Sequence, residues 1–330
     1  MNIIKSLSLA FIGIFLLGIL SSCEEITDVR TLKLAHSLDV THPVHKGMVR
    51  MAELINQKSD GKLQVQIYPS QQLGSERELL ELLQIGSLDV TKVSGAVLEN
   101  FVPQTRVFSL PYLFRDKQHY FNVLDGEIGQ ELLLAGEKYW LRGLTYYDAG
   151  QRSFYTQDRP IRTPEDLEGL KIRVQESPMA VNMINTLGGS PTPISWGELY
   201  TALQQGIVDG AENNPPSFQS SRHYEVSNYF SLDEHTAIPD VLLISTETWD
   251  DLTDQQQRWI QTAADSSKKY QRKIWAEAEE EALKTVQEAG VEVIRPDKEP
   301  FQEKAQTIYE EFKESEPEFY KLIQRIQNVK

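Results

Sequence analysis

The sequence predicts an α/β protein of about two domains. A run of alternating strand and helix patterns begins near Thr31, and a second run of this kind begins near Gly150. The length of 330 residues is sufficient for about two domains. The composition, 40% hydrophobic and 25% charged, is that of an ordinary globular protein with a core of normal size.

Residues 1–22 read as a lipoprotein signal peptide. Lys5 precedes an apolar run over residues 7–20, which is too short to span a membrane comfortably, and small residues stand directly before Cys23. This arrangement matches the bacterial lipoprotein box, in which the thiol is diacylated. Cys23 is the only cysteine of the chain, so lipidation explains it better than a disulfide or a metal site. The alternative is an ordinary cleaved signal with an incidental cysteine. Residues 23–30 are expected to form a lipidated polar tether.

The chain from residue 31 to residue 93 shows a βαβαβ pattern. Helices between strands at this spacing predict parallel neighbours in an open sheet, in which ligands lie beyond the carboxyl ends of the strands. The loops at that edge begin at Ser37, at Gln71 and at Ser94. The expected strands cover residues 32–36, 63–68 and 88–93, and the expected helices cover residues 43–59 and 76–85, with Ser75 as N-cap.

The later part of the chain adds a second α/β unit and then ends in helices. The pattern over residues 253–289 is long for a globular helix, so this helix is expected to lie across two domains. The other expected elements are helices over 119–136, 177–187, 196–205 and from 299 to the end, a capped helix start at 163–166, and strands at 143–147, Arg152, Arg173 and 239–245.

Two arginines are the most informative charged residues of the chain. The net charge of -15 and the isoelectric point near 4.9 argue against nucleic acid as a partner. Arg152 and Arg173 each stand among apolar residues in a strand pattern. A partly buried guanidinium needs an anion or several carbonyl oxygens, and a carboxylate fits its fork best. The pair therefore predicts an anionic ligand; the alternative is that each arginine pairs with an Asp or Glu of the fold.

Five segments together make the chain resemble the solute-binding proteins of tripartite ATP-independent periplasmic (TRAP) transporters. The resemblance covers essentially all of the chain after the tether. It implies two α/β domains with mixed sheets, similar to a type II periplasmic binding protein, that are joined by crossing strands and close on a ligand. The segments are Tyr68–Glu76, Leu110–Phe114, Gly169–Val174, Ser190–Pro193 and Gly197–Gly210.

The resemblance also implies domain boundaries. Domain I would comprise residues 31–150 and about 239–278, and domain II residues 151–238 and about 279–310. Residues 311–330 would form a C-terminal helix.

Binding residues follow from the same resemblance. Arg173 matches the principal carboxylate-binding arginine, and Arg152 matches a second arginine that supports it. Asn213 matches an asparagine that hydrogen-bonds the same end of the ligand. Trp196 stands where relatives have an aromatic or apolar wall, and Glu76 matches an acid that accepts hydrogen bonds from ligand hydroxyls.

Further positions complete the expected site. Lys92 and His36 are expected to donate hydrogen bonds to ligand oxygens, and Glu212 to accept one from a hydroxyl. The alternatives are that Lys92 is solvated, that Glu212 pairs with the second arginine, and that His36 is a structural histidine. Two serines, Ser37 and Ser94, occupy loop positions that line the cleft in relatives.

Residues 210–216 and 231–236, together with His36 and Lys92, look like the subgroup that binds hexuronates such as glucuronate and galacturonate. The resemblance thus implies a periplasmic, lipid-anchored receptor, without catalytic residues, cofactor or metal, that delivers a hexuronate to the permease subunits of a TRAP transporter. A uronate-polymer lyase and a ligand-sensing lipoprotein with the same cleft are alternatives. No glycine-rich phosphate loop, Ser-His-Asp order or zinc spacing stands out in the sequence.

Overall fold

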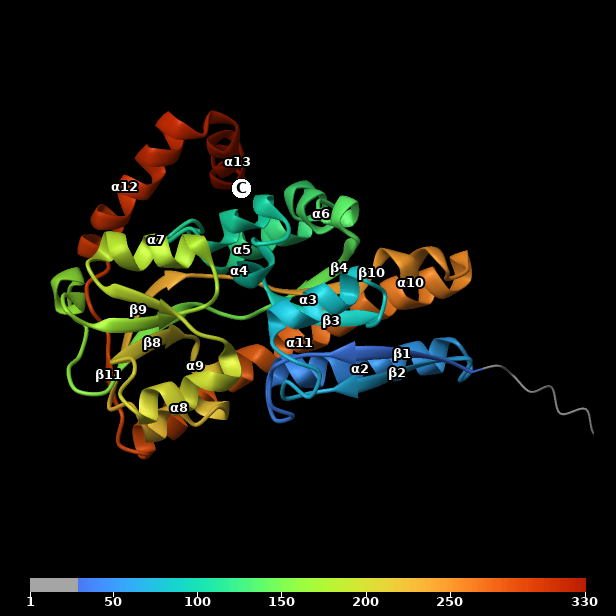
Figure 1. The fold of residues 1–330 in the computed structure, drawn as a ribbon, viewed down its shortest axis with the longest axis horizontal. Coiled ribbons are helices and arrows are strands. Elements are labelled where there is room, and N and C mark those ends of the chain that lie inside the picture. The colour runs from blue at the N-terminus through green and yellow to red at the C-terminus, as the bar shows by residue number, and fades with distance from the viewer. Residues whose placement is uncertain (1–28) are drawn as a thin grey trace, which may run out of the picture.

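A computed structural model describes residues 29–330 as two α/β domains that lie side by side (Figure 1). The predicted signal peptide, the tether as far as residue 28, and Cys23 lie outside the described residues. The predicted domain boundaries remain a prediction. Below, domain I is the domain that contains the first sheet of the chain, and domain II is the domain that contains the second.

Domain I is built on a mixed five-stranded sheet. Its strands are β1 (Arg30–Ala35), β2 (Leu63–Tyr68), β3 (Val90–Ser94), β4 (Leu141–Tyr147) and β10 (Asp240–Ser245). They stand in the order β2-β1-β3-β10-β4. The first strand pairs in parallel with β2 and β3, as the βαβαβ pattern predicts. The late strand β10 inserts antiparallel between β3 and β4, which makes the sheet mixed.

Helices cover the sheet of domain I. Ser75 caps α3 through a capping box with Glu78, as predicted. The helix expected over residues 119–136 is two helices, because Gly126 has an extended backbone that ends one and begins the next. The helices are α2 (Pro43–Lys58), α3 (Glu76–Gln84), α4 (Gly95–Leu98), η1 (Pro103–Ser109), α5 (Lys117–Asp125), α6 (Glu127–Leu134), η2 (Glu137–Tyr139) and α10 (Thr246–Asp250).

Domain II is built on a mixed six-stranded sheet. Its strands are β5 (Arg152–Thr156), β6 (Lys171–Val174), β7 (Ser190–Pro193), β8 (Gly210–Asn213), β9 (Tyr229–Thr236) and β11 (Glu292–Ile294). They stand in the order β11-β9-β5-β8-β6-β7, and β5 pairs antiparallel with both of its neighbours. This arrangement places the strand of Arg152 and the strand of Arg173 on either side of β8.

Short helices connect the strands of domain II. The capping box at Thr163 opens only a single 3₁₀ turn, because the chain reverses at Gly169 with φ +78°. The helices are η3 (Pro164–Leu167), α7 (Pro178–Leu187), η4 (Trp196–Glu198), α8 (Leu199–Gln204), α9 (Pro215–Ser220) and η5 (His223–Glu225).

Three connections join the two domains. The first runs from β4 to β5 through residues 148–151, the second from β9 to β10 through residues 237–239, and the third is helix α11 (Asp254–Glu288). This 35-residue helix begins at Thr253, which caps it with a capping box, and contacts α2 of domain I and α9 of domain II. The prediction of one long helix across both domains is confirmed.

The C-terminal helices form a further link between the domains (Figure 1). The helix expected from residue 299 to the end divides into α12 (Glu299–Ser315) and α13 (Pro317–Gln327), because Pro317 has no N–H and disfavours a helical preceding residue. Helix α12 packs on α7 of domain II, whereas α13 packs on η1 of domain I. The chain end is held on domain I, where Asn122 donates to the carbonyl of Lys330 at 2.6 Å.

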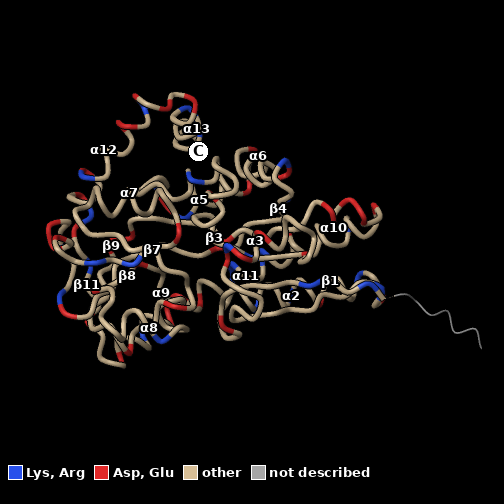
Figure 2. Tube along the Cα trace, viewed as in Figure 1, with Lys and Arg blue, Asp and Glu red and all other residues tan. Residues whose placement is uncertain are grey.

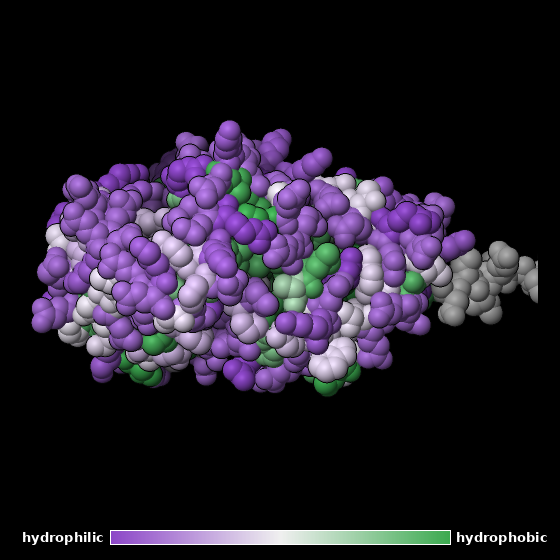
Figure 3. Space-filling view, turned by 90° about the horizontal axis from the view of Figure 1, so that it is seen from above, coloured by the Kyte–Doolittle hydropathy of each residue, from purple (hydrophilic) through white to green (hydrophobic). Residues whose placement is uncertain are grey.

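The surface of the described residues is polar. Acidic and basic residues are interspersed over both domains (Figure 2). One face is largely hydrophilic, with hydrophobic residues gathered near its middle (Figure 3). No helix within residues 29–330 combines the length and the hydropathy that crossing a membrane requires.

Candidate functional site

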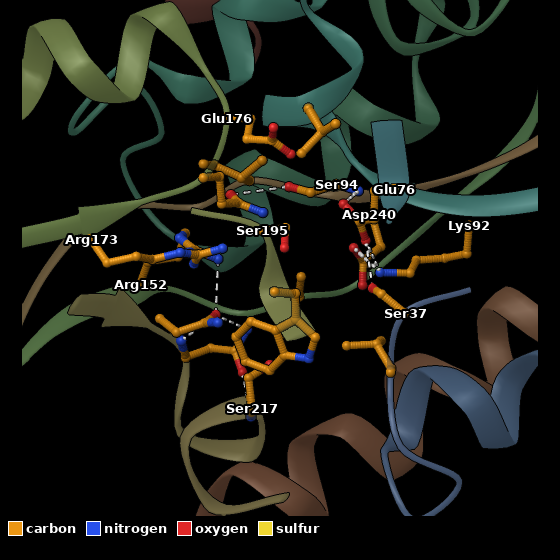
Figure 4. A pocket seen from close by; sticks show the side chains of 18 of the residues that line it. Ser37, Glu76, Lys92, Ser94, Arg152, Arg173, Glu176, Ser195, Ser217 and Asp240 are labelled. Atoms are coloured by element: carbon orange, nitrogen blue, oxygen red, sulfur yellow. Dashed lines mark hydrogen bonds and ion pairs between the residues drawn. The ribbon is translucent and has the colours of Figure 1, made fainter. Parts of the chain in front are cut away.

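A polar cavity lies between the two domains (Figure 4). Its volume is about 50 Å³. Both domains contribute to its walls, because the loops after β1 and β3 meet β5, β6 and β8 there. Of the residues expected to bind a ligand, all but His36 and Glu212 line this cavity: Ser37, Glu76, Lys92, Ser94, Arg152, Arg173, Trp196 and Asn213.

Arg173 presents an uncompensated buried cation to the cavity. Its side chain projects from β6 and is 2% exposed. Nε donates to the carbonyl of Ile194 at 2.8 Å, but within residues 29–330 no carboxylate lies at ion-pair distance and Nη1 is buried without a hydrogen-bond partner. Burial lowers the pKa of Arg173, yet a guanidinium keeps its proton at any physiological pH. A buried charge of this kind calls for an anion from outside the protein.

Arg152 is neutralised by the fold. It forms a buried ion pair with Glu212, in which Nε and Nη2 donate to the two carboxylate oxygens. Nη2 also donates to the carbonyl of Glu212, and Nη1 donates to Oδ1 of Asn213, each at 2.8 Å. Glu212 is therefore a structural partner of Arg152, which is the alternative that the sequence left open. Arg152 therefore borders the cavity but cannot offer a free charge to a ligand.

The pairing of Arg152 orients Asn213. A guanidinium can only donate hydrogen bonds, so the amide oxygen of Asn213 must face it. The same oxygen accepts from the backbone N–H of Asn214 at 2.9 Å. The NH₂ group of Asn213 is consequently turned away from Arg152, and it makes no hydrogen bond with the described residues. Two donors therefore remain available at the cavity that Arg173 also lines.

The wall formed by domain I holds two carboxylates that share one ammonium group (Figure 4). Lys92 Nζ donates to Oε1 of Glu76 at 2.8 Å and to Oδ1 of Asp240 at 3.2 Å. Glu76 also accepts from the hydroxyl of Ser37 and from the backbone N–H of Ser94, each at 3.0 Å. Burial alone raises the pKa of Glu76, but the charge of Lys92 and these hydrogen bonds lower it below its ordinary value.

Asp240 is a cavity residue that the sequence analysis missed. It opens strand β10 beside Ser94, and burial raises its pKa to about 6 even though Lys92 acts in the opposite direction. The available signal is an acid at the head of an otherwise apolar strand, where a carboxylate needs a specific partner. Oδ2 of Asp240 makes no hydrogen bond with the described residues, so it is free to accept one from a ligand hydroxyl.

His36 and Glu212 do not line the cavity. His36 lies behind the wall, where its Nε2 is 3.0 Å from Nδ1 of His45 and its Nδ1 accepts from the N–H of Leu38. Burial, and then the charge of Lys92, lowers the pKa of His36 to about 2, so this ring is neutral. This is the structural role that the sequence analysis held as its alternative.

A second buried histidine completes the network of Glu212. His235 Nδ1 lies 2.8 Å from Oδ2 of Asp233, and its Nε2 lies 3.6 Å from Oε2 of Glu212. Burial lowers the pKa of His235, but the two carboxylates outweigh burial and raise it to about 9. The charges of Arg152 and protonated His235 thus balance those of Glu212 and Asp233, and they leave the charge of Arg173 without a counterpart.

Trp196 forms part of the cavity wall on the side of domain II. Its ring packs against the hydrophobic cores of both domains. The guanidinium carbon of Arg173 lies 5.9 Å from the centre of the Trp196 ring, which is within the range of a cation–π contact. An aromatic face beside the anion-binding group is suited to contact the apolar face of a small ring-shaped ligand.

Polar contacts between the domains hold the cavity closed. Ser94 of domain I donates to Oε1 of Gln175 of domain II at 3.2 Å. The buried carboxylate of Glu99, in domain I, accepts from the hydroxyl of Ser177 at 2.8 Å and from the backbone N–H of Met179 at 2.9 Å. The last two groups belong to the first turn of α7, so a residue of one domain caps a helix of the other.

Comparison with known proteins places this architecture among bacterial receptors. Residues 34–316 match the family described as bacterial extracellular solute-binding protein, family 7. A TRAP periplasmic solute-binding protein of a Bradyrhizobium species, solved with α/β-D-galacturonate, is 42% identical with a TM-score of 0.88, covering 91% of this chain and 100% of the other.

Two further solved structures extend the likeness. A TRAP periplasmic solute-binding protein from Xanthobacter autotrophicus, with bound β-D-galacturonate, is 40% identical with a TM-score of 0.87. One from Chromohalobacter salexigens, with bound D-glucuronate, is 34% identical with a TM-score of 0.88. Each comparison covers 91% of this chain and 100% of the other chain.

The two arginines should differ in their effect on stability. Replacing Arg152 by Met leaves Glu212 buried without its partner and should lower the free energy of unfolding by about 3–5 kcal/mol. Replacing Arg173 by Met removes a buried unpaired charge at the cost of one hydrogen bond, so stability should change by no more than about 1 kcal/mol. Urea denaturation of the ligand-free proteins measures both. An equal loss in the two variants would mean that Arg173 is a structural residue.

Protonated His235 should make stability fall as the pH rises. Its pKa is about 9 in the folded protein against an ordinary value of 6.5. Its contribution is therefore complete below pH 6.5 and is lost between pH 6.5 and 9, on the order of 3 kcal/mol. Denaturation at a series of pH values should show this decline in the wild type and a much smaller one in His235→Gln. Buried neutral histidines such as His36 act in a separate window below pH 6.5, because their pKa is lowered.

Proposed function

Since this chain belongs to family 7 of the bacterial extracellular solute-binding proteins, and so is a TRAP solute-binding protein, we propose that its solute is a D-hexuronate such as glucuronate or galacturonate. The two-domain fold expected from the sequence is confirmed. The assignment of the solute rests on the unpaired cation in the cavity and on the hydrogen-bonding groups that face it.

Arg173 is the observation that carries the proposal. Its Nη groups make no hydrogen bond with the described residues, and Arg173 lines the same cavity as Asn213. A carboxylate can accept two parallel hydrogen bonds from the guanidinium fork and a third from this amide. Binding would then supply the paired anion that Arg173 lacks among the described residues, while Arg152 acts through Asn213 by fixing the orientation of its amide.

The opposite wall selects for hydroxyl groups. Glu76 and Asp240 retain lone pairs that can accept hydrogen bonds, and Lys92 retains one N–H after donating to both of them. Hydroxyls both donate and accept, so the ring hydroxyls of a uronate satisfy all of these groups. A dicarboxylate would place its second negative charge beside the same two acids and be repelled. Trp196 offers its aromatic face to the sugar ring.

Closure couples the two walls. The donors for the carboxylate belong to domain II, and the acceptors for the hydroxyls belong to domain I. A ligand that spans the cavity therefore has more contacts when the domains are closed, and this differential affinity shifts the population towards the closed form. The hydrogen bonds of Glu99 and Ser94 with residues of domain II also stabilise this closed form. We propose that the closed form then delivers the uronate unchanged to a TRAP permease.

We also propose that the receptor acts in the periplasm, held to a membrane by a lipid on Cys23. The sequence around this thiol supports the anchor, and the family supports a location outside the cytoplasmic membrane. The lipid would restrict the receptor to the membrane surface, which raises its effective concentration at the permease.

The uronate assignment predicts a specific dependence on Arg173. The wild type should bind D-glucuronate or D-galacturonate with a dissociation constant of about 1 μM or lower. Arg173→Met should weaken binding by at least about 100-fold, because the charge-assisted pair is lost. Calorimetry measures both, and NMR of the recovered sugar should show it unchanged. Succinate and the neutral sugar D-glucose serve as comparison ligands and should bind far more weakly.

The contribution of closure is measured in the same assay. Glu99→Ala should lower uronate affinity by about tenfold, since Ser177 and the N–H of Met179 lose their acceptor in the closed state alone. Glu53→Ala is the matched control, because Glu53 is an exposed residue of α2 in domain I that does not line the cavity. Affinity that survives Arg173→Met would refute the ligand assignment. If Glu99→Ala leaves the affinity for uronate unchanged, only the proposed role of Glu99 in stabilising the closed form is refuted.

The lipid anchor predicts that Cys23→Ser releases the protein from membranes. In cells expressing the full chain, the wild type should sediment with the membrane fraction and take up a labelled fatty acid, because the thiol is the acylation site. The variant should be soluble and unlabelled. Unlabelled wild-type protein in the soluble fraction would show that residue 23 is an ordinary cysteine.

A further inference from the structure

A second cavity of about 430 Å³ lies at the connections between the domains. All three connections line it, through Gly150 and Gln151 of the first, Ala237 of the second, and Ala276, Glu279 and Leu283 of helix α11. Its shape therefore depends on how the two domains are placed relative to each other.

We call this second cavity the hinge cavity, and the polar cavity that contains Arg173 the uronate cavity. The two lie on opposite sides of the strands that cross between the domains. Along the first connection, Ala149 and Arg152 line the uronate cavity, whereas Asp148, Gly150 and Gln151 line the hinge cavity. The second connection divides in the same way between residues 237 and 238. The two cavities share no lining residue, so a molecule in the hinge cavity would not compete for the groups that hold the uronate.

The hinge cavity combines apolar walls with an excess of negative charge. Its apolar residues include Phe114, Leu232 and Leu283, contributed by both domains and by α11. Its charged residues are five carboxylates and one ammonium group, namely Asp116, Asp148, Glu234, Glu279, Glu280 and Lys117. This composition favours an organic cation with an apolar body.

Much of this charge remains after the ion pairs of the protein are counted. Lys117 Nζ is shared between Asp148 at 3.3 Å and Glu279 at 3.2 Å, so one cation serves two acids. Glu234 pairs with Lys298 outside the cavity. Glu280 is exposed at the rim and forms no ion pair with the described residues. An incoming ammonium group would compensate the remaining negative charge.

A buried hydroxyl also lacks a partner at this cavity. The Tyr120 side chain is 3% exposed and lines the cavity, yet its hydroxyl makes no hydrogen bond within the described part of the chain. A buried hydroxyl without a partner costs stability. Tyr120 belongs to α5, which also carries Lys117, so one helix contributes both residues to the cavity wall.

We propose that the hinge cavity is a second binding site, for a small organic cation with an apolar body, and that its occupant stabilises the closed conformation. The cavity is present in a structure whose domains are latched together by Glu99, and its walls belong to both domains. A molecule that fits it in this arrangement opposes the change of shape that accompanies opening. By thermodynamic linkage, a cation bound in the hinge cavity would raise the affinity of the protein for uronate. Bound uronate would raise the affinity for the cation by the same factor.

Tryptamine is a suitable probe, with tryptophol and indole-3-propionate as neutral and anionic analogues of similar shape. Calorimetry with the whole mature protein should show one tryptamine bound outside the uronate cavity. Tryptophol should bind about tenfold more weakly, and indole-3-propionate more weakly still. Saturating tryptamine should raise the affinity for D-glucuronate several-fold. This last step rests on the proposed function, whereas the binding of tryptamine alone does not.

Paired variants separate the site from general effects of charge. Glu280→Gln should weaken tryptamine, while Glu277→Gln, the same change on an exposed residue of α11 outside the cavity, should leave it unchanged.

Three results would overturn the proposal or part of it. Absence of tryptamine binding at millimolar concentration would remove the site. Equal binding of tryptophol, or an equal effect of both glutamate variants, would refute the choice of a cation. Glucuronate affinity that is independent of tryptamine would refute the coupling, provided that glucuronate itself binds.

Discussion

The unpaired guanidinium of Arg173 is the constraint on which the site depends. Around it the protein pairs its buried charges: Arg152 with Glu212, His235 with Asp233, and Lys92 with two acids. A fold that supplies so many internal partners yet leaves this buried cation without a carboxylate among the described residues has reserved that position for an external anion. The paired groups are equally necessary, because they hold the neighbouring donors and acceptors in place.

Much of the fold could be predicted from local sequence signals. The capping boxes at Ser75 and Thr253 mark helix starts correctly, and the 35-residue helix has the predicted bounds within one residue. Strands β7, β8, β9 and β11 were not predicted, because their pairing depends on partners elsewhere in the chain. The same holds for β10, whose apolar pattern is plain but whose antiparallel place between β3 and β4 is decided by tertiary pairing.

In the binding site, too, the sequence indicates the type of residue needed but not which residue it pairs with. Residue types and family likeness pointed to Arg173, Arg152 and most of the cavity wall, but sequence cannot say which arginine already has an acid beside it. That distinction depends on the register between β5 and β8. In this register Glu212 pairs with Phe154 and Asn213 pairs with Ser153, next to Arg152 in the sequence. Asp240 escaped notice for a related reason, since its ammonium partner lies 148 positions away along the chain.

The docking of the C-terminal helix has a practical consequence for reporting on domain motion. Both ends of the described chain belong to the same rigid half: residue 30 begins β1, and the last carbonyl is held by Asn122 of α5. Fluorophores attached at residue 30 and at residue 330 would therefore keep their separation while the protein opens and shuts. A sensor needs one label on domain I and the other on α8 or α9, which move with the opposite half.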